Sequence, residues 1–241
     1  MKKIVIVGAT SGIGLEIARI YKELGWRIGA AGRRREKLEQ FQSTAPEQIV
    51  IEEIDVTRDD AVEQLHHLIE HLGGMDLFFL SSGIGYQNRA LDTNLEQQTV
   101  KTNVEGFTRM VTAAYHYFQK QGGGHIAVIS SIAGTKGLGA APAYSATKRY
   151  QNTYIDALAQ LSRMEKAAVT FTDIRPGFVR TDLLKDGSYP LQMQADYVAR
   201  KIVRALQRKK RRVVIDWRYA ILVFFWKLIP ERLWERLSIH T

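Results

Sequence analysis

The chain of 241 residues lacks cysteine, has few acidic residues near its end, and contains no long apolar run. Without cysteine it can form neither a disulfide framework nor a thiolate metal site or nucleophile, which fits a reducing cytoplasm. The most apolar stretch, from Ala220 to Trp226, is much shorter than the ~20 residues that a membrane-spanning helix needs. The apolar run after Met1 stops at Gly8 without a small-residue cleavage site, so we interpret it as a first strand and not as a signal peptide.

Positive charge is concentrated at the C-terminal end of the chain. Residues 208–241 hold nine basic and three acidic residues, so +6 of the net charge of +9 lies there. The remaining residues are near neutral, and the basic character therefore belongs to the tail.

Short β-branched apolar runs alternate with segments of helical periodicity, which is typical of βαβ units and of a parallel sheet buried on both faces. We expect strands at Lys3–Val7, Arg27–Ala31, Ile49–Glu53, Leu77–Leu80, His125–Ser130, Val169–Ile174 and Arg212–Ile215. Helices are expected at Gly12–Leu24, Arg34–Phe41, Arg58–Leu72, Leu95–Gln119, Pro142–Met164 and Pro190–Gln207. The predicted fold is α/β, a Rossmann-like doubly wound parallel sheet of about seven strands. We assign residues 1–215 to one catalytic domain and 216–241 to a helical tail that is not an independent domain.

A glycine-rich turn follows the first expected strand directly and opens the first expected helix. Gly8, Gly12 and Gly14 give the spacing G-x-x-x-G-x-G, which is neither G-x-G-x-x-G nor a P-loop. Glycines let the backbone approach a ligand, and the following helix N-terminus presents free N–H groups to a pyrophosphate. The turn therefore predicts dinucleotide binding, the alternative being a plain tight turn.

Residues 32–35 read Gly-Arg-Arg-Arg after the second expected strand. An acidic residue here would bind the adenosine ribose hydroxyls, whereas arginine can pair with a 2′-phosphate. We therefore expect NADP(H) in preference to NAD(H), with Arg33 ahead of Arg34 as the phosphate ligand. A solvated helix start is the alternative for both arginines.

Tyr144 and Lys148 stand four residues apart, and Ser131 lies thirteen residues upstream at the end of an apolar run. On a helix this spacing places the phenol and the ammonium on one face. A neighbouring cation favours the phenolate, so the pair is suited to acid/base chemistry. For an isolated Tyr-x-x-x-Lys the alternative is a half-buried tyrosine and a solvated lysine.

Together these motifs resemble the short-chain dehydrogenase/reductase family of single-domain proteins, over Met1 to Ile215. The resemblance implies an NAD(P)H-dependent oxidoreductase that reduces a ketone or aldehyde to an alcohol, or catalyses the reverse. The implied catalytic residues are Ser131, Tyr144, Lys148 and Asn103. The implied cofactor-binding residues are Gly8, Thr10, Ser11, Gly12, Ile13, Gly14, Arg33, Arg34, Asp55, Val56, Ser81, Gly83, Tyr144, Lys148, Pro176, Gly177, Val179 and Thr181.

The resemblance also implies a role for each catalytic residue. Ser131 and Tyr144 would donate hydrogen bonds to the carbonyl oxygen, and Tyr144 would then give up its proton. Lys148 would bind the nicotinamide ribose hydroxyls and lower the pKa of Tyr144. Asn103 would hold a water that links Lys148 to solvent, and Thr181 would hold the carboxamide of the cofactor.

Two positions depart from the family pattern. Val7 stands where the family has threonine, and Leu80-Ser-Ser-Gly83 replaces Asn-Asn-Ala-Gly. Ser81 would stand in for the asparagine with a shorter reach. We expect a small loss of rigidity, or a water in the place of the asparagine side chain, without loss of cofactor binding.

The substrate side carries less information, because the family reduces many carbonyl compounds. Apolar residues after Thr181 suggest an apolar or mixed pocket, with ordinary loop packing as the alternative. The expected lining residues are Leu183, Leu184, Tyr189, Leu191 and Met193 on one side, and Tyr86, Gln87, Gly137 and Leu138 on the other.

The tail leaves several partners open. Aromatic, apolar residues with basic flanks fit a helix in a membrane interface, and they fit equally a segment buried against the body or a second subunit. A homodimer or homotetramer is expected from the resemblance. Nucleic acid is disfavoured, because the basic run at Arg208–Arg212 overlaps an expected strand and lacks a base-stacking motif.

Further alternatives concern the chemistry. A protein of the same fold could sense the cofactor without turnover, although the intact Ser131, Tyr144 and Lys148 favour an enzyme. A lipid carbonyl reductase associated with a membrane interface is the other alternative. His67 and His71 have metal-ligand spacing, but with only Glu63 and Glu70 as acidic neighbours a solvated helix face is favoured. We therefore expect no metal.

Overall fold

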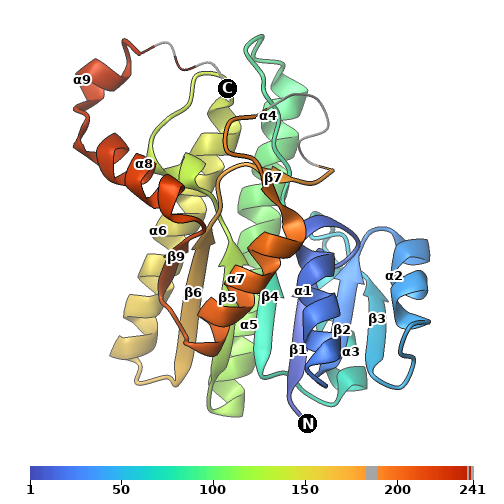
Figure 1. The fold of residues 1–241 in the computed structure, drawn as a ribbon. Helices are drawn as coiled ribbons and strands as arrows, with labels where there is room; N and C mark the ends of the chain where they lie inside the picture. Colours follow the sequence, from blue (N-terminus) through green and yellow to red (C-terminus); the bar gives the residue numbers. More distant parts are fainter. Residues whose placement is uncertain (183–188, 238, 240–241) are drawn as a thin grey trace.

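The computed structural model describes residues 1–182, 189–237 and 239. Seven parallel strands form one sheet in the order β3-β2-β1-β4-β5-β6-β9, with helices on both faces (Figure 1). The strands are β1 (Lys3–Val7), β2 (Arg27–Gly32), β3 (Ile49–Glu53), β4 (Leu77–Leu80), β5 (Gly124–Ile129), β6 (Val169–Arg175) and β9 (Arg212–Val214). The predicted doubly wound sheet is confirmed, and each predicted strand is present to within one residue at either end.

The side chains of β1 show why its apolar run has no polar alternation. Ile4 and Ile6 enter the core on one face of the sheet, and Val5 and Val7 enter the core on the other. All four are fully buried. Burying each such side chain contributes roughly 1.5–3 kcal/mol, so the central strand is held from both sides.

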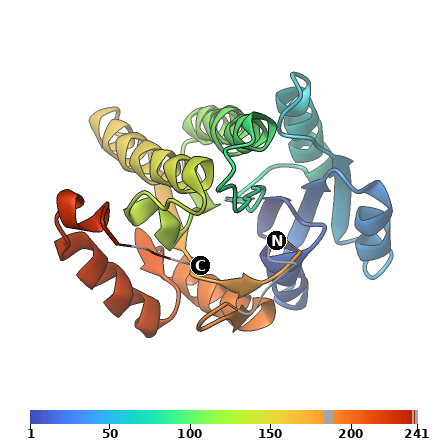
Figure 2. The ribbon, with the colours of Figure 1, turned by 90° about the horizontal axis from the view of Figure 1, so that it is seen from above.

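Helices cover the two faces in two groups, seen from above in Figure 2. The first group contains α1 (Gly12–Glu23), α2 (Arg35–Gln42) and α7 (Ala195–Gln207). The second contains α3 (Ala61–Leu72), α5 (Phe107–Gln121) and α6 (Pro142–Met164).

The strand order reverses at β1, which pairs with β2 on one side and β4 on the other. In open parallel sheets ligands bind beyond the carboxyl ends of the strands at this reversal. Gly8 follows β1, Ser81 follows β4, Ser131 lies just beyond β5 and Pro176 follows β6. The predicted motifs therefore share one edge of the sheet.

The single helix predicted at Leu95–Gln119 is wrong in detail. It consists of α4 (Thr93–Val100), a π-helical turn η1 (Lys101–Gly106) and α5. The wider turn contains Asn103, whose side chain binds both backbone groups of Ile84. π-helical turns occur often at functional sites, and apolar periodicity does not reveal them.

Two other helix starts differ from the prediction. The helix expected from Pro190 begins only at Ala195, because Met193–Gln194 forms β8, which pairs with β7 (Val179–Arg180). The helix expected from Arg58 begins at Ala61, because Asp55 and Thr57 form a hydrogen-bonded turn before it.

The tail forms two helices, α8 (Trp217–Leu228) and α9 (Glu231–Trp234), as the predicted helical tail requires. Tyr219 and Val223 join the core that also contains α1 and α7. Among the described residues no helix is both long and apolar enough to cross a membrane.

Candidate active site

Tyr144 and Lys148 lie on the first turns of α6, where Pro142 starts the helix with a backbone angle that suits its first turn. Lys148 is buried, and its ammonium lies 5.7 Å from the centroid of the Tyr144 ring. Lys148 Nζ donates to the carbonyl oxygen of Ile129 at 3.0 Å, at the end of β5. The predicted pair therefore shares one face of the helix, against the carboxyl end of the sheet.

Ser131 is positioned by the short helix η2 (Ile132–Thr135), which it caps. Its Oγ accepts from the Ala133 amide at 3.1 Å and donates to the carbonyl of Pro176 at 3.4 Å. A hydrogen bond also joins Ser131 to the hydroxyl of Tyr144. Ser131, Tyr144 and Lys148, far apart in sequence, thus meet at one place.

Burial shifts the pKa values of both Tyr144 and Lys148. Burial raises the pKa of Tyr144 above its ordinary value, and the hydrogen bond with Ser131 opposes that rise only in part. Burial also lowers the pKa of Lys148 to about 8, while the charge of Asp173 works in the opposite direction. In the chain alone the pKa of Tyr144 thus lies above its ordinary value, because removing a phenolate from water costs more than Ser131 returns. The lowering expected from Lys148 and the oxidised cofactor stays a prediction.

Asn103 is fully buried and fixes the segment after β4. Its Oδ1 accepts from the Ile84 amide at 2.9 Å, and its Nδ2 donates to the Ile84 carbonyl at 2.7 Å. Its backbone carbonyl accepts from Nε2 of Gln151 at 2.9 Å, and Oε1 of Gln151 accepts from Lys148 Nζ at 3.0 Å. A buried glutamine thus links Asn103 to Lys148. The water that Asn103 was expected to hold between Lys148 and solvent stays a prediction. Sequence reasoning missed Gln151, although its position three residues after Lys148 would place both side chains on the same side of a helix.

A second polar network lies behind the site and was missed in the sequence. Asp173 is fully buried and accepts from Nε and Nη2 of Arg175 at 2.8 and 2.6 Å. Asp173 also accepts from the Ser130 hydroxyl, which in turn accepts from Asn152 Nδ2 at 2.8 Å. The Asp173 carboxylate is the negative charge that partly offsets the lowering of the Lys148 pKa by burial.

The glycine-rich turn is as tight as its sequence suggested. Gly8 and Gly12 have φ of 99° and 55°, in the region that favours glycine. A Cβ on Gly14 would lie 2.1 Å from the carbonyl oxygen of Gly8, and one on Gly8 would lie 2.7 Å from the Ser82 amide. Ile13 points into the core. The N-terminus of α1, with its free N–H groups, follows this turn directly.

Arg34 lies against this turn. Its Nη2 donates to the hydroxyls of Thr10 at 2.7 Å and Ser11 at 2.6 Å. Its Nη1 pairs with Asp182 at 3.2 Å, and this hydrogen bond holds the pKa of Asp182 below its ordinary value. Arg33 is exposed. Arg34 therefore contacts the turn directly, whereas the charge of Arg33 acts on Asp55.

Asp55 follows β3 and accepts from the Thr57 amide and hydroxyl at 3.0 and 2.8 Å. Partial burial raises its pKa, but the bonds from Thr57 and the charge of Arg33 outweigh this, so the pKa lies below its ordinary value. Val56 is buried, and its carbonyl accepts from Arg109 at 2.8 Å. Asp55 is thus held as a carboxylate at the sheet edge.

Gly177 packs directly under the tail. A Cβ on Gly177 would lie 2.2 Å from the ring of Tyr219. Tyr219 Oη accepts from the Phe178 amide at 3.2 Å and donates to the carbonyl of Pro190 or Leu191, at 3.0 and 3.1 Å. The segment after Pro176 is therefore shaped by α8.

Thr181 comes close to the glycine-rich turn. Its Cγ2 would lie 3.0 Å from a Cβ on Gly12, and its Oγ1 donates to the carbonyl of Val179 at 3.5 Å. The residues expected to bind the pyrophosphate and the carboxamide of the cofactor thus adjoin one another at this point.

Ser81 and Gly83 lie in the segment after β4 whose sequence departs from the family pattern. The Ser81 amide donates to the carbonyl of Val7 at 2.8 Å, so the backbone after β4 remains tied to β1. A Cβ on Gly83 would lie 3.3 Å from Asn103 Oδ1 and 3.5 Å from Lys148 Nζ. Gly83 therefore lies beside the buried polar groups of the site.

Of the expected substrate-lining residues, Leu183 and Leu184 fall outside the described residues. Gln87 Nε2 donates to Tyr189 Oη at 3.4 Å, and Tyr189 stacks on Phe178 with ring centroids 4.8 Å apart. The carbonyl of Gly137 accepts from the indole of Trp234 at 2.7 Å. Of the expected lining residues, Gln87 and Tyr189 thus contact each other, and Gly137 contacts Trp234 of the tail.

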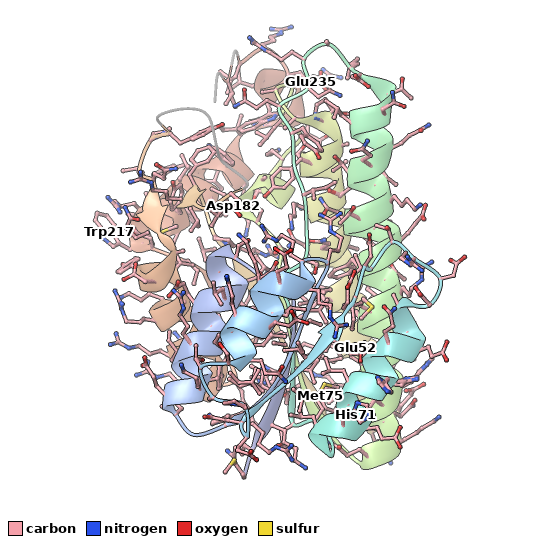
Figure 3. The ribbon with its side chains drawn as sticks, turned by 90° about the vertical axis from the view of Figure 1, so that its right-hand side faces the viewer. Glu52, His71, Met75, Asp182, Trp217 and Glu235 are labelled. Carbon is pink, nitrogen blue, oxygen red and sulfur yellow. The ribbon has the colours of Figure 1, made fainter. Side chains whose placement is uncertain are left out.

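Glu52 of β3 is a neighbour of the histidine pair that sequence spacing did not reveal. Its Oε2 lies 2.6 Å from His67 Nδ1, and the ring centroids of His67 and His71 lie 3.9 Å apart. Glu52 and His71 are labelled in Figure 3. Helical spacing pointed only to Glu63 and Glu70, since Glu52 comes from a strand. The absence of a metal stays a prediction.

Comparison with known proteins adds the following findings. A family model described as short chain dehydrogenase matches residues 2–190. An uncharacterized oxidoreductase of Myxococcus xanthus is 29% identical over 238 residues, covering 95% of this chain and 93% of its own length. Dehydrogenase/reductase SDR family member 7B of Bos taurus is 29% identical over 259 residues, covering 97% and 79%.

Two solved structures share the fold. An alcohol dehydrogenase of Thermococcus sibiricus, complexed with 5-hydroxy-NADP, has a TM-score of 0.78 at 24% identity and covers 89% of this chain and 96% of its own. An actinorhodin polyketide ketoreductase with NADPH has a TM-score of 0.77 at 24% identity, covering 89% and 95%.

Proposed function

Because the chain belongs to the short-chain dehydrogenase family, we propose that it reduces a ketone or aldehyde to an alcohol with NADPH, or catalyses the reverse reaction. One observation carries the proposal: Ser131, Tyr144 and Lys148 meet at the sheet edge where ligands of this fold bind. A hydroxyl bonded to a half-buried phenol beside a buried ammonium is a set of groups suited to moving a proton.

Ser131, Tyr144 and Lys148 have different roles in the proposed reaction. Ser131 Oγ and Tyr144 Oη donate hydrogen bonds to the carbonyl oxygen of the substrate and stabilise the negative charge that develops there. Tyr144 Oη gives its proton to that oxygen. Lys148 holds the ribose hydroxyls, and its positive charge favours the phenolate that Tyr144 leaves. When bound, the nicotinamide cofactor supplies the hydride and a positive ring that favours the phenolate further.

The residues present fit such a cofactor. The turn at Gly8, Gly12 and Gly14 has room for backbone approach only because it lacks Cβ atoms, and the N-terminus of α1 favours a pyrophosphate. Arg33 and Arg34 place positive charge beside this turn, which supports NADP(H) over NAD(H). The NADP-type ligands of the two solved relatives support the same choice.

The test is a panel of ketones and aldehydes followed by NADPH absorbance, with wild type and Tyr144→Phe. The variant lacks the proton donor but keeps the ring, so it should bind NADPH while turnover falls by about 10²–10⁴-fold. Unchanged turnover would remove the catalytic role of Tyr144. Wild-type NADPH binding without turnover of any carbonyl would favour a cofactor-sensing protein instead.

We further propose that the protein is cytoplasmic and that it forms a homodimer or homotetramer. Light scattering of the purified protein tests the oligomeric state, and a monomer would refute it. Residues 216–241 would not fold alone, because Tyr219, Val223 and Trp234 of the tail are buried against the body. A tail released by limited proteolysis that stays helical would contradict this division.

A further inference from the structure

α8 is apolar on all sides, although the body covers only one of them. Tyr219 and Val223 are buried in the core. On the opposite side, positions i, i+4, i+7, i+8 and i+11 align five large side chains that are between 48% and 70% exposed: Trp217, Ile221, Phe224, Phe225 and Leu228. We call these five residues the α8 stripe. A helix that is apolar all round calls for a second apolar environment on its free side.

The α8 stripe lies at the edge of the molecule. In Figures 1 and 2, no other element of the described chain covers the outer side of α8. Trp217 projects outward at the left edge of Figure 3. The stripe is therefore open to a large, flat partner.

Basic groups border the stripe. Arg218 and Lys227 lie on α8 and are exposed. At the start of α8 lies a cavity of about 320 Å³. Its charged lining residues are Lys201, Arg204, Arg208, Lys210 and Asp216, and its apolar lining residues are Ala205, Val213, Val214 and Ile215. The Asp216 carboxylate already pairs with Arg218 at 2.9 Å. Within the described part of the chain, Arg204, Arg208 and Lys210 form no ion pair, so the cavity suits an anion.

We propose that the α8 stripe and this cavity form a docking surface for an anionic phospholipid bilayer. The aromatic and aliphatic side chains of the stripe insert among the acyl chains at the interface, and the cavity receives a headgroup phosphate. This surface is independent of the proposed reaction, because none of its residues belongs to the catalytic set.

Charge selects a bilayer over a second copy of the chain. An isologous contact through α8 would bring the tail of one copy against the same tail of the other. Residues 208–241 of each copy, which include the tail and the basic run before it, carry nine basic and three acidic residues, so the two copies would repel. An anionic membrane surface complements that charge and offers the apolar layer that the stripe needs.

The experiment is co-sedimentation of the full chain with vesicles of phosphatidylserine and phosphatidylcholine, compared with phosphatidylcholine alone. Wild type should bind the anionic vesicles, and less so at high salt. The variant F224E/F225E should lower the bound-to-free ratio about tenfold or more, because it places carboxylates in the acyl region. Both side chains are exposed, so the fold should persist. Met164→Glu, at an exposed apolar site at the end of α6, is the matched control and should bind like wild type.

The cavity has its own variant, R204E/K210E, which should weaken binding to anionic vesicles by about tenfold, while K120E/R163E, on other helices, should change it much less. Wild type that stays in the supernatant, or F224E/F225E that sediments as well as Met164→Glu, would overturn the proposal. A wild-type oligomer that dissociates in F224E/F225E, without vesicle binding, would assign the stripe to a second copy. Full binding by R204E/K210E would overturn the role of the cavity.

Discussion

Replacing Gln151 by leucine should change the protonation of Lys148. The buried Gln151 amide accepts from Lys148 Nζ at 3.0 Å and donates to the Asn103 carbonyl at 2.9 Å. The ammonium has one other acceptor among the described residues, the carbonyl of Ile129. Leucine fills the space of glutamine but accepts no hydrogen bond, so the charged form of Lys148 loses half of its neutral acceptors.

The size of the effect follows from that hydrogen bond. A bond to a charged group contributes roughly 1.5–3 kcal/mol, which corresponds to about one to two pKa units. The pKa of Lys148, already lowered by burial to about 8, should fall accordingly in Gln151→Leu. Lysine is charged below its pKa, so the variant should lose the cation at neutral pH, where wild type retains most of it.

The assay is kcat/KM as a function of pH, which reports the pKa values of the free enzyme. If catalysis needs charged Lys148, activity falls as pH rises through its pKa, and this limb should move down by about one to two units in Gln151→Leu. Gln151→Glu adds a negative charge and should move the same limb up. Gln160→Leu, at an exposed position of the same helix, should leave it in place. Identical limbs in wild type and both Gln151 variants would refute the reasoning.

Three further predictions follow from the structure. Alanine in place of Arg33 or Arg34 should lower the ratio of NADPH to NADH affinity by about 10–100-fold, since a charge-assisted bond to the 2′-phosphate is lost; an unchanged ratio in both variants would place the phosphate elsewhere. Burial lowers the pKa of His125 to about 4 in the folded protein, below its ordinary value of about 6.5. As pH falls from 6.5 towards 4, the unfolded chain therefore binds a proton before the folded protein does, and the free energy of unfolding falls by about 2 kcal/mol at pH 5. Urea unfolding at pH 7 and pH 5 should show a smaller loss for His125→Gln; an equal loss would exclude this histidine as the cause. Gly177→Ala should cost about 1–3 kcal/mol in urea unfolding, because its Cβ would meet an aromatic ring of α8, whereas Gly139→Ala meets nothing within 4 Å; equal stability of the two would contradict the packing.

The sequence predicted best what depends on local pattern. The β-branched run of β1 predicted its strand because both faces of a parallel sheet are apolar. The spacing of Tyr144 and Lys148 predicted a shared face because four residues make about one helical turn. Glycine at positions 8, 12 and 14 predicted a tight turn because side chains cannot adopt or fit that backbone.

Contacts between distant segments were harder to predict. The π-helical turn at Asn103 depends on its bonds to Ile84, which no periodicity records. Burial of the site, which raises the pKa of Tyr144 in the chain alone, depends on how the whole edge of the sheet closes around it. Both sides of α8 carry apolar residues, so the sequence alone does not show which side is buried. Only the fold shows that Tyr219 is buried and that the apolar residues on the opposite side are exposed.

Tyr219 has a consequence for how this protein could diversify. Its hydroxyl bonds the amide of Phe178 and the carbonyl of Pro190 or Leu191, so one side chain clasps both ends of the intervening chain. Once the ends of a segment are fixed, doubling its length costs only about 0.6 kcal/mol of closure entropy. Insertions after Asp182, beyond the residues that pair with β8 and contact the glycine-rich turn, would therefore cost the fold little. New substrate preferences could arise by lengthening one segment, while the fold that carries the chemistry stays as it is.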